Sequence, residues 1–172
     1  MIIRPAQQQD APGIAKVHVE TWQSHYRGHM PDDFLDVLSV DDRAAFWTNS
    51  LAKSSEDCRT YVAEEDGKII GFCSVGPMRG DDAIEEVGEL YAIYAHPEDQ
   101  GKGAGKDLMK TGLHFLKEKG YKKTILWVLK GNTKTRDFYE SRGWMCDGIE
   151  KVIPRNGFAF EEIRYSIELP TE

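Results

Sequence analysis

Apolar residues in the first third of the chain recur mainly at helical spacing. A helix is predicted to begin at Asp10, with Pro12 just inside its start, and to carry Ile14 and Val17 on one face. Gly28 interrupts that pattern. This part of the chain is therefore expected to be mostly helical. Its predicted elements are a strand at 1–4 and helices at 10–28, 31–38 and 41–52.

From Thr60 onward the pattern changes to that of strands. Two apolar runs flank Asp66 and Gly67, a dipeptide that tolerates the positive φ angles of a tight hairpin. A later run stops before Pro97, which cannot donate to a strand ladder. The remaining predicted elements are strands at 61–63, 69–75, 86–95, 123–129, 145–153 and 158–167 and helices at 105–120 and 132–142. Together they predict an α/β fold in which helices cover a mixed sheet.

The size and charge of the chain narrow the class of protein. A length of 172 residues, 40% of them hydrophobic, suits one globular domain that spans 1–172. No apolar run approaches the ~18 residues of a membrane helix, and the first residues lack the pattern of a signal peptide. A formal charge of -7 opposes nucleic-acid binding, which needs a basic surface. We therefore expect a cytoplasmic protein with no membrane or nucleic-acid partner.

The cysteines and histidines do not form a metal-site pattern. Cys58, Cys73 and Cys146 are odd in number and widely spaced, so we expect buried free thiols rather than a disulfide framework. His25 and His29 have metal-ligand spacing, but a glycine between them breaks helical continuity and no third ligand is evident. The sequence therefore predicts no bound metal.

The residues from Gln100 to Lys106 form a glycine-rich loop between a predicted strand and a predicted helix. Glycines leave successive backbone N–H groups free of Cβ obstruction, and the helix start adds about half a positive charge. Such a loop suits a pyrophosphate. The side chain of Lys102 is expected to add positive charge, as is that of Lys106.

Spacing decides which phosphate ligand this loop fits. A Walker A loop needs glycine where Gln100 stands and serine or threonine where Asp107 stands. A dinucleotide fingerprint needs its third glycine at Lys106 and an acid about 20 residues later, where this chain is apolar. Loops for ATP, GTP and dinucleotides are therefore disfavoured. The pattern that remains is Gln-x-x-Gly-x-Gly, formed by Gln100, Gly103 and Gly105.

This segment resembles the acetyl-CoA loop of the GNAT N-acetyltransferase superfamily. A second segment, from Asn132 to Trp144, resembles the Asn-x-x-Ala-x-x-Phe-Tyr-x-x-x-Gly-Phe helix of the same family. It departs from that pattern at Thr135, which replaces the usual alanine, and at Trp144, which replaces phenylalanine. The two motifs lie in the family's order and distance. The predicted strands and helices also follow the family's order over nearly the whole chain.

The resemblance implies a mixed, mostly antiparallel central sheet flanked by helices, with acetyl-CoA as the co-substrate. In the family, loop amides hold the coenzyme pyrophosphate, and the preceding strand, opened by a β-bulge, bonds the pantetheine arm through its backbone. Asn132 matches a residue that touches this arm, although a simple helix N-cap would look the same. The residues implied in coenzyme binding are Ile93, Tyr94, Ala95, Gln100, Gly101, Lys102, Gly103, Ala104, Gly105, Lys106 and Asn132.

The resemblance also implies two catalytic side chains. Tyr139 matches the tyrosine that protonates the departing thiolate, a step open to a phenol with a free pKa of about 10. Its alternative role is packing beside Phe138. Glu89 matches the glutamate base of the histone-acetylating branch, and strand alternation places it on the same face as Tyr91 and Ile93. An ordinary strand acid, with water carrying the proton, is the alternative for Glu89.

The acceptor side is defined less closely. Relatives build the acceptor pocket from their first helices, so Trp22 and Tyr26, with His25 beside them, are expected to line it. The implied reaction is direct attack of a primary amine on the thioester in a ternary complex. Acidic runs such as Asp32-Asp33 favour a small cationic amine or a polyamine, while a peptide acceptor and a homodimer stay open. A non-catalytic acyl-CoA sensor or partner module is the alternative function.

Overall fold

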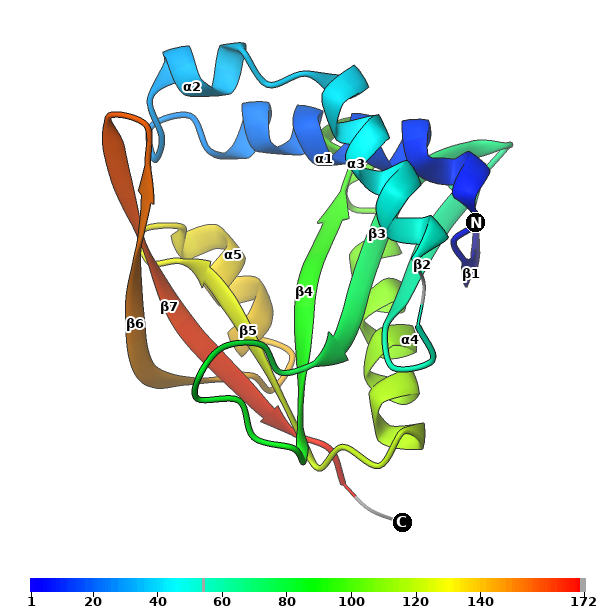
Figure 1. Ribbon diagram of the computed structural model, residues 1–172, viewed down its shortest axis with the longest axis vertical. Coiled ribbons are helices and arrows are strands. Elements are labelled where there is room, and N and C mark those ends of the chain that lie inside the picture. Colours follow the sequence, from blue (N-terminus) through cyan, green and yellow to red (C-terminus); the bar gives the residue numbers. More distant parts are fainter. Residues whose placement is uncertain (54, 171–172) are drawn as a thin grey trace.

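The seven strands of the described residues join into one sheet, in the order β1-β2-β3-β4-β5-β7-β6. The computed structural model describes residues 1–53 and 55–170 (Figure 1). Its strands are β1 (Ile2–Pro5), β2 (Arg59–Glu65), β3 (Lys68–Pro77), β4 (Val87–Ala95), β5 (Lys123–Leu129), β6 (Met145–Arg155) and β7 (Phe158–Glu168). Its α-helices are α1 (Ala11–His25), α2 (Asp32–Asp36), α3 (Val40–Ala52), α4 (Ala104–Glu118) and α5 (Thr133–Glu140), and its 3₁₀ turns are η1 (Gln8–Asp10) and η2 (Pro97–Asp99).

Neighbouring strands are antiparallel except β4 and β5, which are parallel. The predicted mixed, mostly antiparallel sheet is therefore confirmed. The hairpin between β2 and β3 turns at Asp66 and Gly67, whose φ angles are 51° and 79°. Both values are positive, as the sequence predicted for a tight hairpin.

The first long helix begins at its predicted start signal, and α3 begins one residue before the predicted Asp41. Asp10 is the N-cap of α1, and proline stands in the first turn. The Ser39 hydroxyl caps α3 by accepting the backbone N–H of Asp42 at 3.1 Å. The differences lie at the ends, because α1 stops at His25 and α2 covers only Asp32–Asp36.

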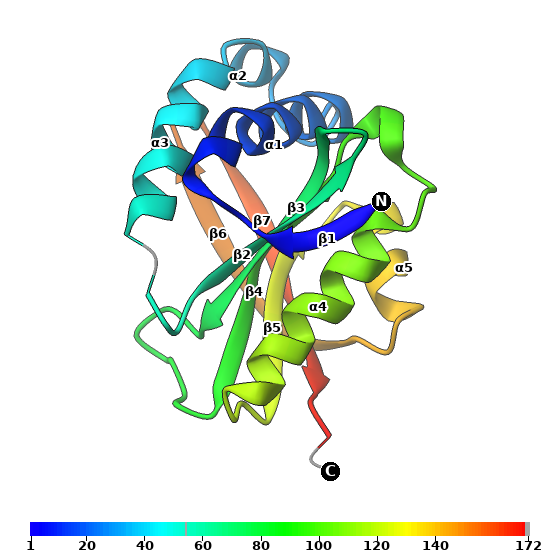
Figure 2. The ribbon, with the colours of Figure 1, turned by 90° about the vertical axis from the view of Figure 1, so that its right-hand side faces the viewer.

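Two layers of helices cover the two faces of the sheet. Figure 2 shows α1 and α3 on one side of the strands and α4 on the other. The α4 side holds one large apolar cluster, which includes Leu108, Leu116 and Tyr165, all of them fully buried. The α1 side holds smaller separate clusters, one around Phe72 and Trp47 and another around Leu35. None of the helices in the described residues is long and apolar enough to cross a membrane.

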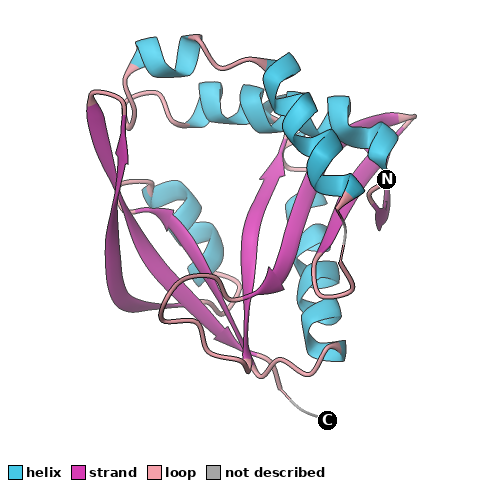
Figure 3. Ribbon diagram, in the orientation of Figure 1, coloured by secondary structure: helices cyan, strands magenta, loops and turns pink. Residues whose placement is uncertain are grey.

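The strands β4 and β5 start side by side and then separate. Their parallel pairing covers only the pairs from Val87–Lys123 to Glu89–Ile125. Beyond Glu89 they diverge, as Figure 3 shows. The pairing of β4 with β3 also skips Tyr91, because Val75 faces Leu90 while the preceding Ser74 faces Ala92. A β-bulge at Tyr91 therefore lies at the start of the divergence.

The cysteines match their prediction only in part. All three are free thiols, but only Cys73 is buried, whereas Cys58 and Cys146 are exposed. Cys146 lies near the start of β6, an outer strand of the sheet that has a partner on one edge only. The expectation of buried thiols was therefore wrong for two of the three.

Candidate active site

The glycine loop leads from η2 into α4, at the end of β4 that has separated from β5. Gly101 and Gly103 have φ angles of 84° and 87°, and Gly103 is the N-cap of α4. A Cβ on either would meet no atom of the described residues within 4 Å. The first N–H groups of α4, which have no partner within the helix, therefore lie beside open space. This geometry suits an anion, as the sequence predicted for Gln100 to Lys106.

The side chain of Lys102 is held beside the loop by carboxylates. Its Nζ lies 2.6 Å from Glu65 Oε2 and 2.9 Å from Asp99 Oδ1. These contacts raise the pKa of Lys102 and hold the pKa of Asp99 below its usual range. Lys68 approaches the same Asp99 at 3.3 Å. The positive charge expected from Lys102 is therefore largely neutralised, while Lys106 is exposed.

The free edge of β4 contains the three strand residues predicted to bind the coenzyme. Ile93 and Ala95 pack against the cluster on the α4 face, whereas Tyr94 packs against the cluster on the α1 face. The bulge at Tyr91 shifts the alternation, so the expectation that Ile93 shares a face with Glu89 was wrong. Beyond Glu89 the β5 side of β4 has no strand partner in the described residues. The backbone groups on that side have no strand partner to displace, although the Ala95 carbonyl accepts long side-chain hydrogen bonds from Thr21 at 3.4 Å and Gln100 at 3.5 Å.

Three phenols come together where β4 leaves β5. The hydroxyls of Tyr26 and Tyr94 lie 3.3 Å apart. Tyr139, on α5, is buried with its ring against those of Phe138 and Trp144. Burial raises the pKa of Tyr139, and the nearby Tyr94 hydroxyl raises it further. Tyr139 therefore stays protonated at neutral pH.

Asn132 begins α5 and is buried. Its Oδ1 accepts the backbone N–H of Thr135 at 3.3 Å, so it is the N-cap of this helix. This contact accounts for asparagine at this position without a ligand. A contact between Asn132 and the coenzyme stays a prediction.

Glu89 is buried on β4, where Arg79 holds both of its carboxylate oxygens. Arg79 Nη2 lies 2.7 Å from Oε2, and the Arg79 backbone N–H donates to Oε1 at 3.1 Å. The guanidinium also stacks on the ring of Tyr91, 4.1 Å from its centre. Glu89 is thus one partner of a fixed ion pair, and its role as a base stays a prediction.

Both residues predicted to line the acceptor pocket lie at the C-terminal end of α1. The rings of Trp22 and Tyr26 lie 4.9 Å apart, and His18 stacks on Tyr94. The Trp22 indole N–H is buried near the Tyr94 hydroxyl, and this contact acts to lower the pKa of that phenol, against the larger effect of burial. Trp22 and His18 also line a groove of about 350 Å³ between α1 and the start of α3.

The two histidines of the possible metal pair turn to different neighbours. His25 Nε2 lies 2.8 Å from the side-chain nitrogen of Gln100. The ring of His29 lies against Gly131, since a Cβ on that glycine would stand 3.4 Å from His29 Nδ1. No group of three possible metal ligands occurs among the residues that the structure describes.

Comparison with known proteins agrees with this geometry. The acetyltransferase (GNAT) family matches residues 16–144. The chain belongs to this family. An uncharacterised N-acetyltransferase of Bacillus subtilis (strain 168), YuaI, is 35% identical over 131 residues, which cover 76% of this chain and 72% of that protein.

Solved GNAT structures share the fold. A ribosomal-protein-alanine N-acetyltransferase from Brucella melitensis superposes with a TM-score of 0.76 at 20% identity, over 98% of this chain and 100% of that one. The structure of yncA from Salmonella typhimurium with its cofactor acetyl-CoA gives a TM-score of 0.72 at 21% identity, over 100% and 95% of the two chains. This GNAT chain is accordingly an N-acetyltransferase with the fold that its sequence predicted.

Two charged residues near these side chains were missed by the sequence analysis. Arg79 lies in the segment between β3 and β4, and no local pattern connects it with Glu89. Glu162 on β7 had a signal, because Phe158 and Phe160 set an alternation that places Glu162 on the same face. A carboxylate at a position where alternation predicts an apolar residue is a reason to look for a function.

Proposed function

We propose that this GNAT enzyme transfers the acetyl group of acetyl-CoA to a primary amine by direct attack. The observation that carries the proposal is the divergence of β4 from β5, with the glycine loop at its open end and Tyr139 beside it. A carrier with its diphosphate at the start of α4 would extend along the unpaired edge of β4. Its acyl end would then lie among the three phenols.

The loop from Gln100 to Lys106 would hold the diphosphate through backbone N–H groups. The free edge of β4 at Ile93, Tyr94 and Ala95 would bond the amide groups of the pantetheine arm. Both contacts use backbone donors and acceptors that have no other strand or helix partner. Asn132 lies at the start of α5 and is the proposed side-chain contact to the same arm.

Tyr139 would give its proton to the thiolate that leaves. Burial raises the pKa of Tyr139, which keeps the proton on the phenol but also makes the phenol a weaker acid. Burial acts on a thiol in the same direction, and it raises the pKa of the nearby Cys73 to about 12. A thiolate expelled into these surroundings would be correspondingly basic. Burial therefore shifts the acid and the leaving thiolate in the same direction, so burial alone does not decide the direction of the proton transfer from Tyr139.

The acceptor nitrogen must lose a proton before it attacks. An alkylammonium with a pKa of ~10.4 is neutral in about 1 part in 2,500 at pH 7, which costs about 4.6 kcal/mol. Glu89 is the base predicted from the sequence, but its ion pair with Arg79 occupies both oxygens. Glu89 would have to give up one of these contacts to accept a proton. The side chains proposed to line the acceptor pocket are Trp22 and Tyr26.

The test is release of coenzyme thiol from acetyl-CoA in the presence of a panel of primary amines. The panel should include diamines, polyamines, amino acids and peptide N-termini, with product mass as a second readout. We expect thiol release that depends on the amine. The mass of the acceptor should increase by about 42 units for each acetyl group that it gains. Calorimetric binding of acetyl-CoA without release over the whole panel would contradict the proposal.

A further inference from the structure

We infer that Glu162 on β7 is the carboxylate that receives the amine of the acceptor and takes its proton. This inference rests on the proposed acetyl transfer and assigns one further residue to its acceptor side. It gives the proton-accepting role to Glu162 in place of Glu89.

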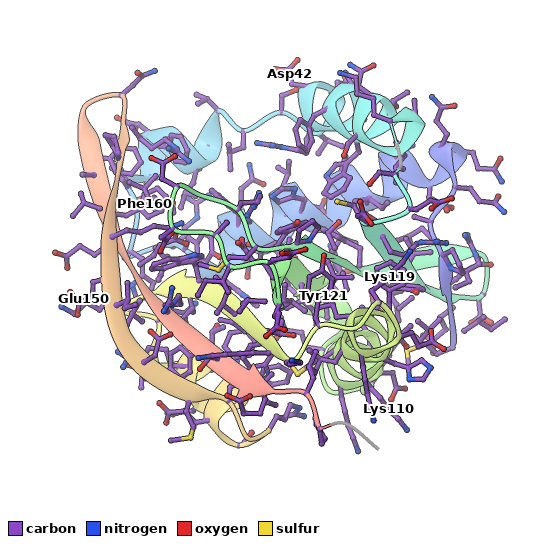
Figure 4. All side chains as sticks on the ribbon, turned by 60° about the horizontal axis from the view of Figure 1, so that its bottom comes forward. Asp42, Lys110, Lys119, Tyr121, Glu150 and Phe160 are labelled. Atoms are coloured by element: carbon purple, nitrogen blue, oxygen red, sulfur yellow. The ribbon has the colours of Figure 1, made fainter. Side chains whose placement is uncertain are left out.

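The position of Glu162 follows from the register of the sheet. It lies opposite Leu129 on β5 and opposite Lys151 on β6. Two residues earlier on the same face, Phe160 packs with Met30 and Leu35 below α2, and Figure 4 shows Phe160 on the inner side of the β6–β7 hairpin. Glu162 therefore faces the α1 side of the sheet, where the acceptor residues gather.

The neighbours of Glu162 are the aromatic residues of that side. Trp22 and Tyr26 pack against the same cluster as Phe160. The negative charge of Glu162 lies close enough to Tyr26 and Tyr94 to raise the pKa of both phenols, although burial is the larger cause for each. The carboxylate and the rings thus lie on the same side of the sheet, around the cluster that contains Phe160. Together they suit an organic ammonium, which binds both to an anion and to the faces of aromatic rings.

Glu162 is held much less tightly than Glu89. Its side chain is 21% exposed, and among the described residues it forms one long ion pair, 3.6 Å from Oε1 to Lys151 Nζ. Lys151 also lies over the ring of Trp127, 4.1 Å from its centre. Glu89, by contrast, is almost fully buried and accepts three hydrogen bonds from Arg79. Glu162 can therefore take a new partner without losing a strong one.

The electrostatic setting favours a carboxylate that can change its protonation state. Burial raises the pKa of Glu162 above its usual value, and the charge of Glu89 on β4 raises it further. Lys151 and Arg155 on β6 act in the opposite direction. The phenols of Tyr26 and Tyr94 face it from α1 and β4. A base with a raised pKa accepts a proton from an ammonium more readily than an ordinary glutamate does.

The protons of the reaction balance with Glu162 in this role. The ammonium gives one proton to the carboxylate, which passes it to water after turnover. The neutral nitrogen then attacks the thioester carbon, so that a C–N bond forms and the C–S bond breaks. Tyr139 protonates the sulfur, and the second proton lost by the nitrogen restores the phenol. The sum is amide, free thiol and one released proton.

The test compares Glu162→Gln with Glu161→Gln, using the amine that the wild-type enzyme turns over fastest. Glu161 is the neighbouring residue, exposed and on the opposite face of β7, so it is the matched control. We expect E162Q to lower kcat/KM for the amine by about 10²-fold or more, while E161Q stays within about twofold of wild type. The KM for acetyl-CoA and its calorimetric Kd should be unchanged in both.

The pH profile separates a proton acceptor from a group that only supports the fold. In the wild type, kcat/KM for the amine should fall as the pH drops through the pKa of Glu162. That limb should be absent in E162Q and present in Glu162→Asp, which should recover part of the activity. If E162Q fails to bind acetyl-CoA, the comparison rests on E162D, which keeps the carboxylate but moves it back.

Each contrary outcome has a distinct meaning. Wild-type activity in E162Q, with the acidic limb intact, would overturn the inference and leave the proposed acetyl transfer standing. The same holds if E162D retains full activity, since a carboxylate shortened by one methylene group should take the proton less well from an amine placed for glutamate. Failure of the wild-type enzyme to release thiol with any amine would overturn the acetyl transfer and the role of Glu162 together.

Discussion

The two faces of the central sheet are built differently. On the α4 face one continuous cluster runs from β2 to β7 and includes Leu108, Leu116 and Tyr139. On the α1 face the apolar residues form separate clusters around Phe72, Leu35 and Ile125. Charged and hydrogen-bonding side chains, Glu89 and Glu162 among them, stand between these clusters. The α4 face is therefore a packed face. The α1 face, whose apolar clusters are separated by polar side chains, is an interrupted face.

The difference bears on how this fold would bring the proposed acid and the proposed base to one reaction. Tyr139 belongs to the packed face, whereas Glu89, Tyr94 and Glu162 belong to the interrupted face. A closed sheet would keep these groups apart. Because β4 separates from β5 after Glu89, Tyr139 comes close enough to influence the pKa of Tyr26 from the opposite side. The divergence of β4 from β5 is therefore the place where Tyr139 on one face comes near the phenols on the other face.

The largest expected effect concerns the acid on the packed face. Tyr139→Phe keeps the ring but removes the proton, so kcat for thiol release should fall by about 10²- to 10³-fold. The matched control is Tyr61→Phe, which lies in the same cluster on β2, away from the opening. It should change kcat by less than about twofold. Equal kcat values for the two variants would remove Tyr139 from the mechanism.

The next effect tests whether the continuous cluster is the scaffold. Leu108 and Leu35 are both 0% exposed, one in the continuous cluster and one in a small cluster of the other face. Truncation to alanine should lower the free energy of unfolding by about 4 kcal/mol at Leu108 and about 2 kcal/mol at Leu35. Urea unfolding measures both. A larger loss at Leu35 would reverse the assignment of the two faces.

A third effect is specific to the interrupted face and appears on acidification. Burial lowers the pKa of His18 to about 4, with Arg43 adding to the shift, and its Nδ1 accepts the Trp47 indole N–H at 3.3 Å. Between pH 6.5 and 4 the unfolded chain binds a proton that the folded chain refuses, so stability falls as the pH falls. At pH 4.5 the loss from this residue should be about 2–3 kcal/mol.

His18→Gln isolates that contribution, because glutamine does not titrate. The free energy of unfolding should be measured by urea at pH 7.5 and pH 4.5 for both proteins. The wild type should lose about 2–3 kcal/mol more than the variant over this interval. Parallel losses in the two proteins would show that His18 accepts its proton in the folded state as readily as in the unfolded chain.

The sequence was most informative where structure depends on neighbours along the chain. The hairpin at Asp66-Gly67, the start of α1 at Asp10 and the glycine loop all follow from local backbone requirements. It failed at Ile93, because one bulge residue, Tyr91, reverses the alternation of the rest of β4. A bulge depends on pairing with another strand, which the local pattern of apolar and polar residues does not contain.

Long-range charge partners were the other part that could not be predicted. Arg79 reaches Glu89 from a loop, and Glu65 reaches Lys102 from the β2–β3 hairpin. Each pairing changes the chemistry of a residue whose position had been predicted correctly. The place of a charged side chain is thus more predictable than its availability, since availability depends on groups that the fold brings from elsewhere.

The smallest expected effect tests this point at the coenzyme loop. Lys102→Met should weaken acetyl-CoA binding by less than about threefold, because Glu65 and Asp99 already neutralise the ammonium. Lys106→Met, at an exposed position of the same loop, should weaken it more at low salt. Calorimetry at two salt concentrations gives both values. A loss above about tenfold for Lys102→Met would mean that this lysine leaves its carboxylates to bind the phosphates. Its positive charge would then no longer be neutralised in the complex with the coenzyme.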